Sequence, residues 1–486
     1  MPHSLLGVRP FLFVAVFDES GFMKIKVVAI AKDEAAYLPE WCFHHLYFGF
    51  DACEVWLNNI TDNSIEVCKT LVTRTQNRFS WVMADDLLAS CNVKGKNFQT
   101  EAYNIAFGQA RRQGFSHVLF IDLDELWIPH DFQSSIHDYL ASKDLTQADV
   151  VSFNWAIDTP LHLRPAYARP FSDLMWVHNN RHVKSLVRTS AKVERINIHT
   201  ARLKNSENFF LADGRPFKLL EDDQHERSLM SRQQFEVREK RLAGAFIYHR
   251  IYRSQHEYLS SLDKGRRHAS NDARPLKLNR LGYRSDPKST KAKRYNIDQQ
   301  HINEYEAAWG SFLTSELVSH QSSSRAFVTN RYETVLTKLQ ENDCYLFARY
   351  QGLFHSVTDK GIQRLRRKLN WGPKPSSINY VAVTDISLFS GQIVLKGYGF
   401  NLHSRKVISG ATLLSSSGRE YSLSISPVTS EIAADAFDRA PEKCGFVMRS
   451  DAQWDGTIES FCVTIGEHDY TVPLDFLPSI SILEVN

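Results

Sequence analysis

The chain has 486 residues, of which 43% are hydrophobic and 23% are charged. This length predicts two or three domains, and this composition excludes general disorder. The 58 Lys and Arg residues against 55 Asp and Glu residues leave a net charge of +3, which argues against a dedicated nucleic-acid-binding protein. No run of about 18 apolar residues is present, so no transmembrane helix is predicted.

The N-terminus and the cysteines bear on location in the cell. Residues 1–22 are predicted to be an extension, because Arg9 and Pro10 interrupt their apolar run and no convincing cleavage site follows. An uncleaved segment lying at a membrane surface is the alternative. The seven cysteines are scattered without a CxxC pair, which fits reduced thiols and does not fit zinc. We therefore expect a cytoplasmic protein, with contact to the inner face of the membrane left open.

The first part of the chain alternates between predicted strands and helices. KIKVVAIA (24–31) predicts a buried strand, and the helix after it has Pro39 in its first turn and Gly49 at its end. Such alternation is typical of an α/β domain with a mainly parallel, Rossmann-like sheet. Further strands are expected over 53–59, 79–85, 117–121 and 150–157, and a helix with Phe98, Ala102, Ile105 and Ala106 on its buried face ends at Gly114.

The rest of the chain changes character twice. Residues 266–294 are strongly basic without periodicity and predict a loop, whereas 300–370 predict helices with Tyr305, Trp309 and Phe312 as core contacts. WGPKPSS (371–377) has the composition of a linker, and alternating apolar and polar residues after it predict an all-β sandwich. The predicted organisation is an α/β domain over 23–265, a basic loop and helical segment over 266–370, and a β-sandwich over 378–486.

Two carboxylates follow the strand HVLFI (117–121). In a strand, residues i and i+2 point the same way, so Asp122 and Asp124 are expected on one face. The C-terminal end of an inner parallel strand is where ligands bind in open sheets. A cation relieves the repulsion between such carboxylates, and oxygen ligands favour Mg²⁺ or Mn²⁺. The alternative is a carboxylate pair that is merely solvated.

Two earlier strand ends also carry polar side chains. Asp33 and Glu34 follow the first strand, and Asn58, Asn59 and Asp62 follow the second. These side chains are suited to hydrogen bonds with a base or a ribose. Their alternative interpretation is turn and N-cap formation, which Asn and Asp favour.

Five segments in order resemble glycosyltransferases of the family 2-like and family 92-like groups. The resemblance covers about half of the chain, residues 24–265, and implies a GT-A fold and transfer of a sugar from a nucleotide sugar. The segments are VVAIAKDEAAYLPEWCFHHLYFGFDACEVWLNNITDNS (27–64), FQTEAYNIAF (98–107), FIDLDELWIP (120–129), HVKSLVRTSAKVERINIHT (182–200) and YHRIYRSQHEYLSSLDKG (248–265).

The resemblance also implies roles for single residues. Asp122 and Asp124 would hold the metal and diphosphate, with His249 as the third ligand and His199 as the alternative. Lys184 would face the diphosphate, and Asp33 stands where the family usually has Asn. Leu57 and Ile60 also depart from the family pattern, which weakens the assignment of uridine. The residues implied for the nucleotide sugar are Asp33, Glu34, Asn58, Asp62, Gln99 and Lys184.

The transfer needs a stabilised leaving group and an activated acceptor hydroxyl. The metal and Lys184 would stabilise charge on the leaving diphosphate. Asp158, after the strand 150–157, is a weak candidate for a catalytic base, and a solvated loop acid is its alternative. Inversion and retention are both open. Three tryptophans are candidates for stacking on sugar, although core packing is the alternative for each: Trp127, Trp155 and Trp176.

The expected function is a metal-dependent glycosyltransferase with a UDP-sugar donor and a glycan or lipid-linked acceptor, in surface polysaccharide synthesis. The basic stretch 266–294 and the cluster from Arg364 to Lys368 beside Leu365 and Leu369 are candidates for an anionic acceptor or a membrane surface, with solvated surfaces as the alternative. A non-catalytic carbohydrate-binding or scaffold protein is the second hypothesis. A nucleotidyltransferase is disfavoured, because no Gly-rich loop follows the first strand.

Overall fold

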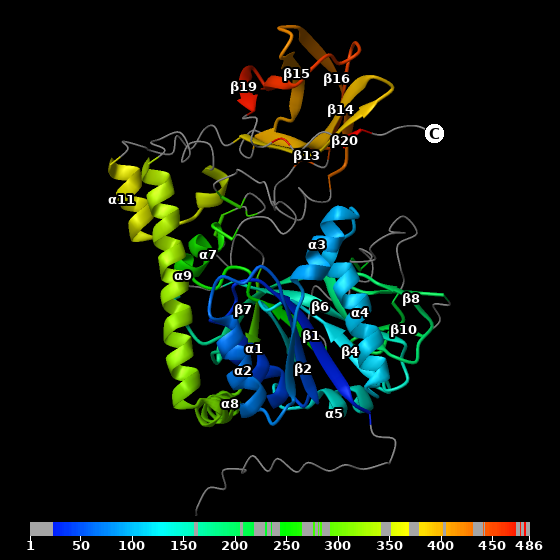
Figure 1. The fold of residues 1–486 in the computed structure, drawn as a ribbon, viewed down its shortest axis with the longest axis vertical. Coiled ribbons are helices and arrows are strands. Elements are labelled where there is room, and N and C mark those ends of the chain that lie inside the picture. Colours follow the sequence, from blue (N-terminus) through cyan, green and yellow to red (C-terminus); the bar gives the residue numbers. More distant parts are fainter. Residues whose placement is uncertain are drawn as a thin grey trace, which may run out of the picture.

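A computed structural model shows an α/β domain followed by a separate all-β domain (Figure 1). The predicted extension 1–22, the linker 371–377 and most of the basic stretch 266–294 lie outside the described residues. No helix in the described part of the chain is long and apolar enough to cross a membrane. The structure describes residues 23–159, 164–204, 208–217, 229–230, 235, 244–264, 276–277, 280, 282–283, 292–341, 351–368, 379–401, 405–430, 441, 443–472, 477 and 481–482.

The α/β part and the helices after it are built from short elements. Its strands are β1 (Ile25–Ala31), β2 (Ala52–Leu57), β3 (Phe79–Met83), β4 (His117–Phe120), β5 (Glu125–Ile128), β6 (Val150–Asp158), β7 (Leu174–Arg188), β8 (Val193–Ile196), β9 (Ala201–Leu203), β10 (Phe209–Leu211), β11 (Phe246–His249) and β12 (Lys293–Asn296). Its helices are α1 (Leu38–Tyr47), α2 (Ser64–Arg74), α3 (Asp85–Val93), α4 (Phe98–Arg112), α5 (Ile136–Ser142), α7 (Gln255–Ser261), α8 (Gln299–Phe312), α9 (Ser315–Glu341), the 3₁₀ turn η1 (Gln351–Phe354) and α11 (Lys360–Lys368).

The main sheet has the order β3-β2-β1-β4-β7-β6-β11-β5, with β10 on β6 and β12 on β7. Strands β1 to β4 pair in parallel, as the sequence predicted. The long strand β7 then runs antiparallel between β4 and β6, and β5 runs antiparallel to β11. The sheet is therefore mixed rather than mainly parallel, although all its strands except β5 and β7 share one direction.

Helices cover both faces of this sheet. Along β1, Val27 and Ala29 belong to a core with α1 and α2, whereas Val28 and Ile30 belong to a core with α4. This alternation is the two-residue period of a strand buried on both sides. Pro39 lies in the first turn of α1, and Gly49 follows its end with a φ of 87°, as predicted.

One residue predicted to lie on the buried face of α4 does not lie there. Phe98, Ala102 and Ala106 are buried against the sheet, but Ile105 is 39% exposed. The buried stripe continues through Ala110, and Ile105 lies beside this stripe on the solvent side.

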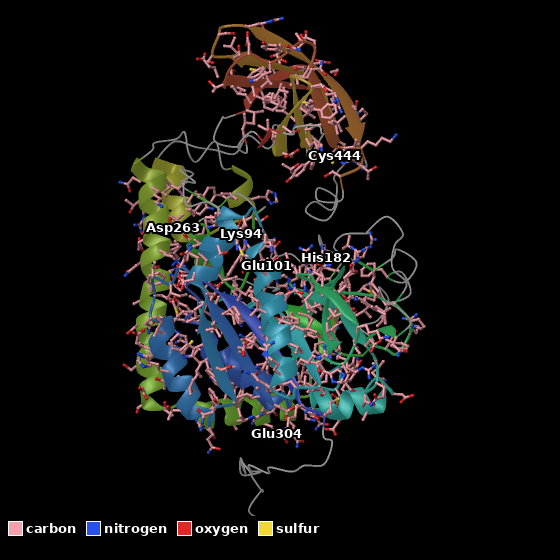
Figure 2. The ribbon with its side chains drawn as sticks, turned by 45° about the vertical axis from the view of Figure 1, so that its right-hand side comes forward. Lys94, Glu101, His182, Asp263, Glu304 and Cys444 are labelled. Carbon is pink, nitrogen blue, oxygen red and sulfur yellow. The ribbon has the colours of Figure 1, made fainter. Side chains whose placement is uncertain are left out.

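The helices after residue 292 extend the α/β core. Tyr305, Trp309 and Phe312 of α8 are buried as predicted, and their rings pack against Phe43 of α1. Figure 2 shows side chains filling the space between sheet and helices, with Glu304 of α8 at the outer edge. In α11, Leu365 is buried in a cluster with α9, so its side chain is not free for the membrane contact considered above.

The C-terminal domain is confirmed as all-β. Its strands run antiparallel except for a short parallel pairing of β13 with β20. They enclose a separate apolar core that includes Tyr421, Phe446 and Phe461. The strands, in the order β19-β18-β15-β16-β17-β14-β13-β20, are β13 (Asn379–Phe389), β14 (Gln392–Asn401), β15 (Ile408–Ser415), β16 (Glu420–Val428), β17 (Gly445–Ser450), β18 (Ile458–Ile465), β19 (His468–Val472) and β20 (Ser481–Ile482).

Candidate functional site

The predicted site residues follow strands that share one direction. Since β1, β4, β6 and β11 all point the same way, their C-terminal ends lie along one edge of the sheet. Glu34 follows β1, Asp122 and Asp124 follow β4, Asp158 ends β6, and His249 ends β11. This is the edge at which open α/β sheets bind ligands.

Asp122 and Asp124 do not lie on one face of a strand. Strand β4 ends at Phe120, and the backbone N–H of Glu125 donates to the carbonyl of Asp122 across 3.1 Å, which closes a turn. The prediction that both carboxylates share a strand face is therefore wrong. The turn arises because the chain leaves β4 for β5, which pairs with β11 at the far edge of the sheet.

The Asp122 side of the turn rests on buried polar groups. Its carboxylate accepts a hydrogen bond from Gln99 Nε2 at 3.2 Å and lies 3.2 Å from Lys184 Nζ. Lys184 also lies 3.4 Å from Glu125 Oε2, and neither of these two side chains is exposed. Glu125 Oε2 in turn accepts from the backbone N–H of Asp122 at 2.7 Å. Gln99, Lys184 and Glu125 therefore fix the position of Asp122.

The charges of this group depend on one another. Burial raises the pKa of Glu125 to about 7, although the positive charge of Lys184 lowers it. Burial lowers the pKa of Lys184, but the carboxylates of Asp122 and Glu125 outweigh burial, so its pKa lies above the usual value. Lys184 is therefore a fixed positive charge beneath Asp122.

On the other side of the turn, Asp124 contacts the end of β11. His249 Nε2 lies 3.5 Å from Asp124 Oδ2, and the backbone N–H of Arg250 donates to the Asp124 carbonyl at 2.7 Å. Burial raises the pKa of Asp124, but the charges of His249 and then Arg253 outweigh it and hold the pKa well below its usual range. His249 Nδ1 is buried without a hydrogen-bond partner among the described residues.

His199, the alternative third ligand, occupies another position. Its Nδ1 lies 3.0 Å from the carbonyl of Val183, and its ring meets Trp155 edge-on. Burial, and after it the charge of Lys184, lowers the pKa of His199 to about 3. Of the two histidines, the structure therefore places His249 against a turn carboxylate.

Three residues predicted to line the nucleotide pocket are engaged in hydrogen bonds between the two loops. Asp33 Oδ1 accepts from the backbone N–H of Thr61 at 2.6 Å, and Asn58 Nδ2 donates to the carbonyl of Ala31 at 3.1 Å. Asp62 accepts from the backbone N–H of Ala35 at 2.8 Å. These bonds tie the loop after β1 to the loop after β2. Of the three residues, Asp62 also makes the local turn contact considered as the alternative, because its Oδ1 accepts from the backbone N–H of Ser64 at 3.0 Å.

Glu34, the fourth predicted residue of these loops, belongs to an ion cluster instead. Its carboxylate forms ion pairs with Lys264 and, at 3.5 Å, with Arg253. Burial raises the pKa of Glu34, but these two cations outweigh it and lower the pKa below its usual value. Neither cation was a predicted site residue, although both lie in the segment 248–265 that carries the last of the family-like motifs. Which residues of that segment meet Glu34 depends on the pairing of β11 with β6, which no local pattern gives.

Asp158 is buried and forms an ion pair with Arg164, so the alternative of a solvated loop acid is wrong.

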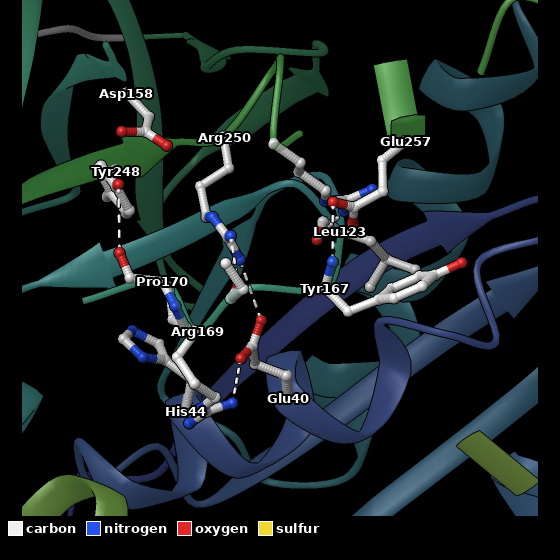
Figure 3. A network of polar contacts seen from close by, with 12 residues as sticks. Glu40, His44, Leu123, Asp158, Tyr167, Arg169, Pro170, Tyr248, Arg250 and Glu257 are labelled. Atoms are coloured by element: carbon white, nitrogen blue, oxygen red, sulfur yellow. Dashed lines mark hydrogen bonds and ion pairs between the residues drawn. The ribbon is translucent and has the colours of Figure 1, made fainter. Parts of the chain in front are cut away.

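A second ion network joins the end of β11 to α1 (Figure 3). Arg250 Nη1 reaches Glu40 of α1 at 3.1 Å, and Glu40 also pairs with Arg169. These contacts fasten the end of β11 to α1. A small pocket lies between them, lined by Tyr37, Glu40, Trp41, Leu123, Asp124, Leu126, Arg250 and Arg253.

The three candidate tryptophans differ in position. Trp127 is fully buried among Phe48, Phe50 and Phe153, so stacking on a sugar is excluded for it. Trp155 is half-buried, and its ring centroid lies 4.3 Å from that of His249. Trp176 lies half-buried on β7, beneath the guanidinium of Arg294. Trp155 is thus the tryptophan that the structure brings next to the turn.

No protein-family model and no curated protein matches this chain. Within the described residues, no three or more His, Cys, Asp or Glu side chains are already gathered around a single point as metal ligands. The interpretation of the site therefore rests on its geometry and on the chemistry of its side chains.

Proposed function

We propose that the protein is a metal-dependent glycosyltransferase that transfers a sugar from a nucleotide sugar. One observation carries this proposal: the turn from Asp122 to Glu125 presents two carboxylates at the C-terminal edge of the sheet. The side chains of Asp122 and Asp124 are 24% and 23% exposed, whereas Lys184 beneath them is fully buried. Buried supports under partly exposed carboxylates fit a site whose oxygen atoms face a ligand.

The residues present fit a divalent cation. Asp122 and Asp124 offer oxygen atoms, and His249 lies 3.5 Å from Asp124 with its Nδ1 left without a described hydrogen-bond partner. These three residues would hold Mn²⁺ or Mg²⁺. The ion would supply positive charge to the diphosphate leaving group. Gln99 and Lys184 position Asp122 for this role, and the end of β11 positions Asp124.

The remaining parts of the proposal come from the resemblance to the family 2-like and family 92-like transferases and, for the cytoplasmic location, from the scattered cysteines. The donor would be a UDP-sugar, and the acceptor a glycan or a lipid-linked glycan of a surface polysaccharide, assembled in the cytoplasm at the inner face of the membrane. Trp155 is the aromatic residue best placed to contact a sugar beside His249. Because Asp158 is paired with Arg164, we assign no catalytic base.

Thermal melting with UDP tests the proposal, with and without Mn²⁺. A ligand that binds only the folded protein raises the melting temperature, so UDP with Mn²⁺ should raise it more than either alone. Asp124→Asn should remove the metal-dependent part of the rise and lower donor hydrolysis about 100-fold or more. Asp86→Asn, at an exposed carboxylate on α3, should change neither.

A screen of donor hydrolysis over several nucleotide sugars would then identify the sugar. If no nucleoside diphosphate raises the melting temperature and no nucleotide sugar is hydrolysed, the transferase proposal fails. The non-catalytic carbohydrate-binding or scaffold protein would then be the better interpretation.

A further inference from the structure

The sequence assigned the diphosphate-facing positive charge to Lys184, but the position of this residue does not favour that role. Its side chain is fully buried, and its Nζ contacts Asp122 at 3.2 Å and Glu125 at 3.4 Å. The same nitrogen lies 3.4 Å from the carbonyl of Ile198. Since Lys184 is occupied by internal contacts, a bound diphosphate needs cations from elsewhere.

Three cations from distant parts of the chain meet beside the loop after β1. Arg253 and Lys264 both pair with Glu34. Arg331, in the middle of α9, extends its Nη1 to 4.0 Å from Asp33 Oδ2 and donates from Nε to Ser260 Oγ at 3.2 Å. Arg253, Lys264 and Arg331 are called the cation cluster below.

Arg331 is the member of the cation cluster whose charge is least compensated. Arg253 interacts with Asp124 and Glu257 as well as with Glu34, and Lys264 pairs with Glu34. The carboxylate beside Arg331 is that of Asp33, which already accepts two hydrogen bonds from Thr61. Arg331 is 8% exposed, and its Nη1 is buried without a hydrogen-bond partner among the described residues. A buried guanidinium nitrogen without such a partner is costly, so a bound anion would complete this group.

The pKa of Lys264 reflects the same crowding. Burial lowers it, the carboxylate of Glu34 raises it, and the charge of Arg331 lowers it again, so the pKa lies below its usual value. Lys264 therefore carries its proton at some cost, and a nearby anion would reduce this cost.

Arg253 brings the cation cluster into contact with the turn that carries Asp122 and Asp124. Arg253 Nη2 donates to the carbonyl of Leu123 at 3.2 Å, within the turn itself, and its charge interacts with both Asp124 and Glu34. Its guanidinium also lies over the ring of Tyr37, 3.4 Å from the centroid. A ligand that contacts Asp124 through a metal ion would thus have Arg253 as its next neighbour.

Helix α9 is held firmly against the segments that follow β1 and β2. Asn63, at the start of α2, donates to the carbonyl of His320 at 3.0 Å and accepts from Ser324 Oγ at 2.7 Å. Val328 packs against Ala36 and Tyr37 one turn later. The next turn brings Arg331 to Asp33. Arg331 is therefore positioned by its helix rather than reaching the loop from a free end.

We propose that Arg253, Lys264 and Arg331 bind the phosphate groups of a nucleoside diphosphate, with Arg331 of α9 as a specificity residue for the phosphorylated ligand. This inference deepens the transferase proposal, on which the identity of the ligand rests. It assigns the helical segment after residue 292 a direct part in the site. Guanidinium groups suit phosphate because they donate paired hydrogen bonds to its oxygen atoms.

The experiment measures binding of inorganic pyrophosphate by calorimetry with the full chain in metal-free buffer. Arg331→Gln and Lys264→Gln should each raise the dissociation constant of pyrophosphate about 10-fold or more, the effect of losing one charge-assisted hydrogen bond. Arg331→Lys keeps the charge and should bind with intermediate affinity. Arg325→Gln, on an exposed position of the same helix, should bind as the unaltered protein does.

The outcomes separate this inference from the transferase proposal. If the unaltered protein does not bind pyrophosphate, or if Arg331→Gln and Lys264→Gln bind it normally, the inference is overturned. The transferase proposal would survive in that case if the rise in melting temperature with UDP and Mn²⁺ still required Asp124. If pyrophosphate binding depends on Arg331 but no nucleotide sugar is hydrolysed, the inference stands and the transferase proposal fails. Should Arg331→Gln fail to fold, the comparison of Lys264→Gln with Arg331→Lys decides in its place.

Discussion

His44 and His45 are neighbours on α1, and both bind the main chain of Trp127 on β5. His44 Nε2 lies 2.8 Å from the Trp127 carbonyl, and the Trp127 N–H donates to His45 Nε2 at 3.4 Å. The first contact needs a protonated Nε2 and the second an unprotonated one, so the two rings are neutral in opposite tautomers. Burial lowers the pKa of His45 to about 3 and that of His44 well below its usual value.

These two histidines make stability depend on pH. Their pKa values in the folded chain lie below the unfolded value of about 6.5, so the unfolded chain binds the protons. The stability they contribute is full above pH 6.5 or so and is lost as the pH falls, by about 1.4 kcal/mol per pH unit for each histidine. Urea unfolding between pH 7.5 and pH 5 measures this slope. His45→Gln should remove the contribution of one histidine, which is about half of the part of the slope that the two histidines cause. An unchanged slope in that variant would contradict the assignment.

Lys184 gives a second prediction at the scale of single residues. Lys184→Met leaves Asp122 and Glu125 without their buried cation, so the free energy of unfolding should fall by about 3–5 kcal/mol. Adding Glu125→Gln removes one of the stranded charges and should restore part of the loss. Urea unfolding of the single and double variants measures the coupling. Losses that simply add would show that the ion pair contributes nothing.

The sequence allowed the residues of the turn to be predicted more reliably than their geometry. Gln99 lies 3.2 Å from Asp122, and His249 lies 3.5 Å from Asp124. The prediction that Asp122 and Asp124 share one face of a strand was wrong, because a backbone hydrogen bond closes a turn after β4. The position of Arg331 beside Asp33 was not predicted. Its contact with Asp33 joins residues that are far apart in the sequence, and only the packing of α9 brings them together.

At the scale of elements, local patterns predicted β1, α1 and α4 because each depends on its own periodicity and end signals. Pro39 and Gly49 bound α1 whatever surrounds it. The direction of β7 has no such signal. It lies between β4 and β6 because its register pairs Leu186 with Leu119 on one side and with Val151 on the other, which is a tertiary choice.

Helix α8 gives the prediction that belongs to this scale. Because Trp309 packs against Phe43 in the core of the α/β domain, Trp309→Ala should lower the free energy of unfolding by about 3 kcal/mol or more. Glu304→Ala, on the exposed side of α8, should change it by less than about 0.5 kcal/mol.

The same packing makes the helical segment part of the folding unit. A fragment of residues 23–265 should therefore melt without a cooperative transition, whereas 23–370 should show one. Cooperative melting of the shorter fragment would contradict this view and support a domain boundary at 265.

At the scale of the whole molecule, the two domains have separate cores. The apolar cluster of the C-terminal strands contains no residue from the α/β domain, and no described strand pairs across the two. Residues 378–486 should therefore fold when expressed alone, with a cooperative melt. Calorimetry of the full chain should show this transition at the same temperature. A single transition in the full chain, absent from the isolated piece, would mean that the domains depend on one another.

The packing of α9 limits which changes of sequence this helix can accept. Ser324, Val328, Arg331 and Lys338 meet four different partners along one stripe of a continuous helix. Inserting or deleting one residue between Ser324 and Arg331 would turn the guanidinium by about 100° around the helix axis and away from Asp33. Single substitutions on the outer surface of the helix would leave this stripe in place. The segment is thus free to vary in composition on that surface but not in length.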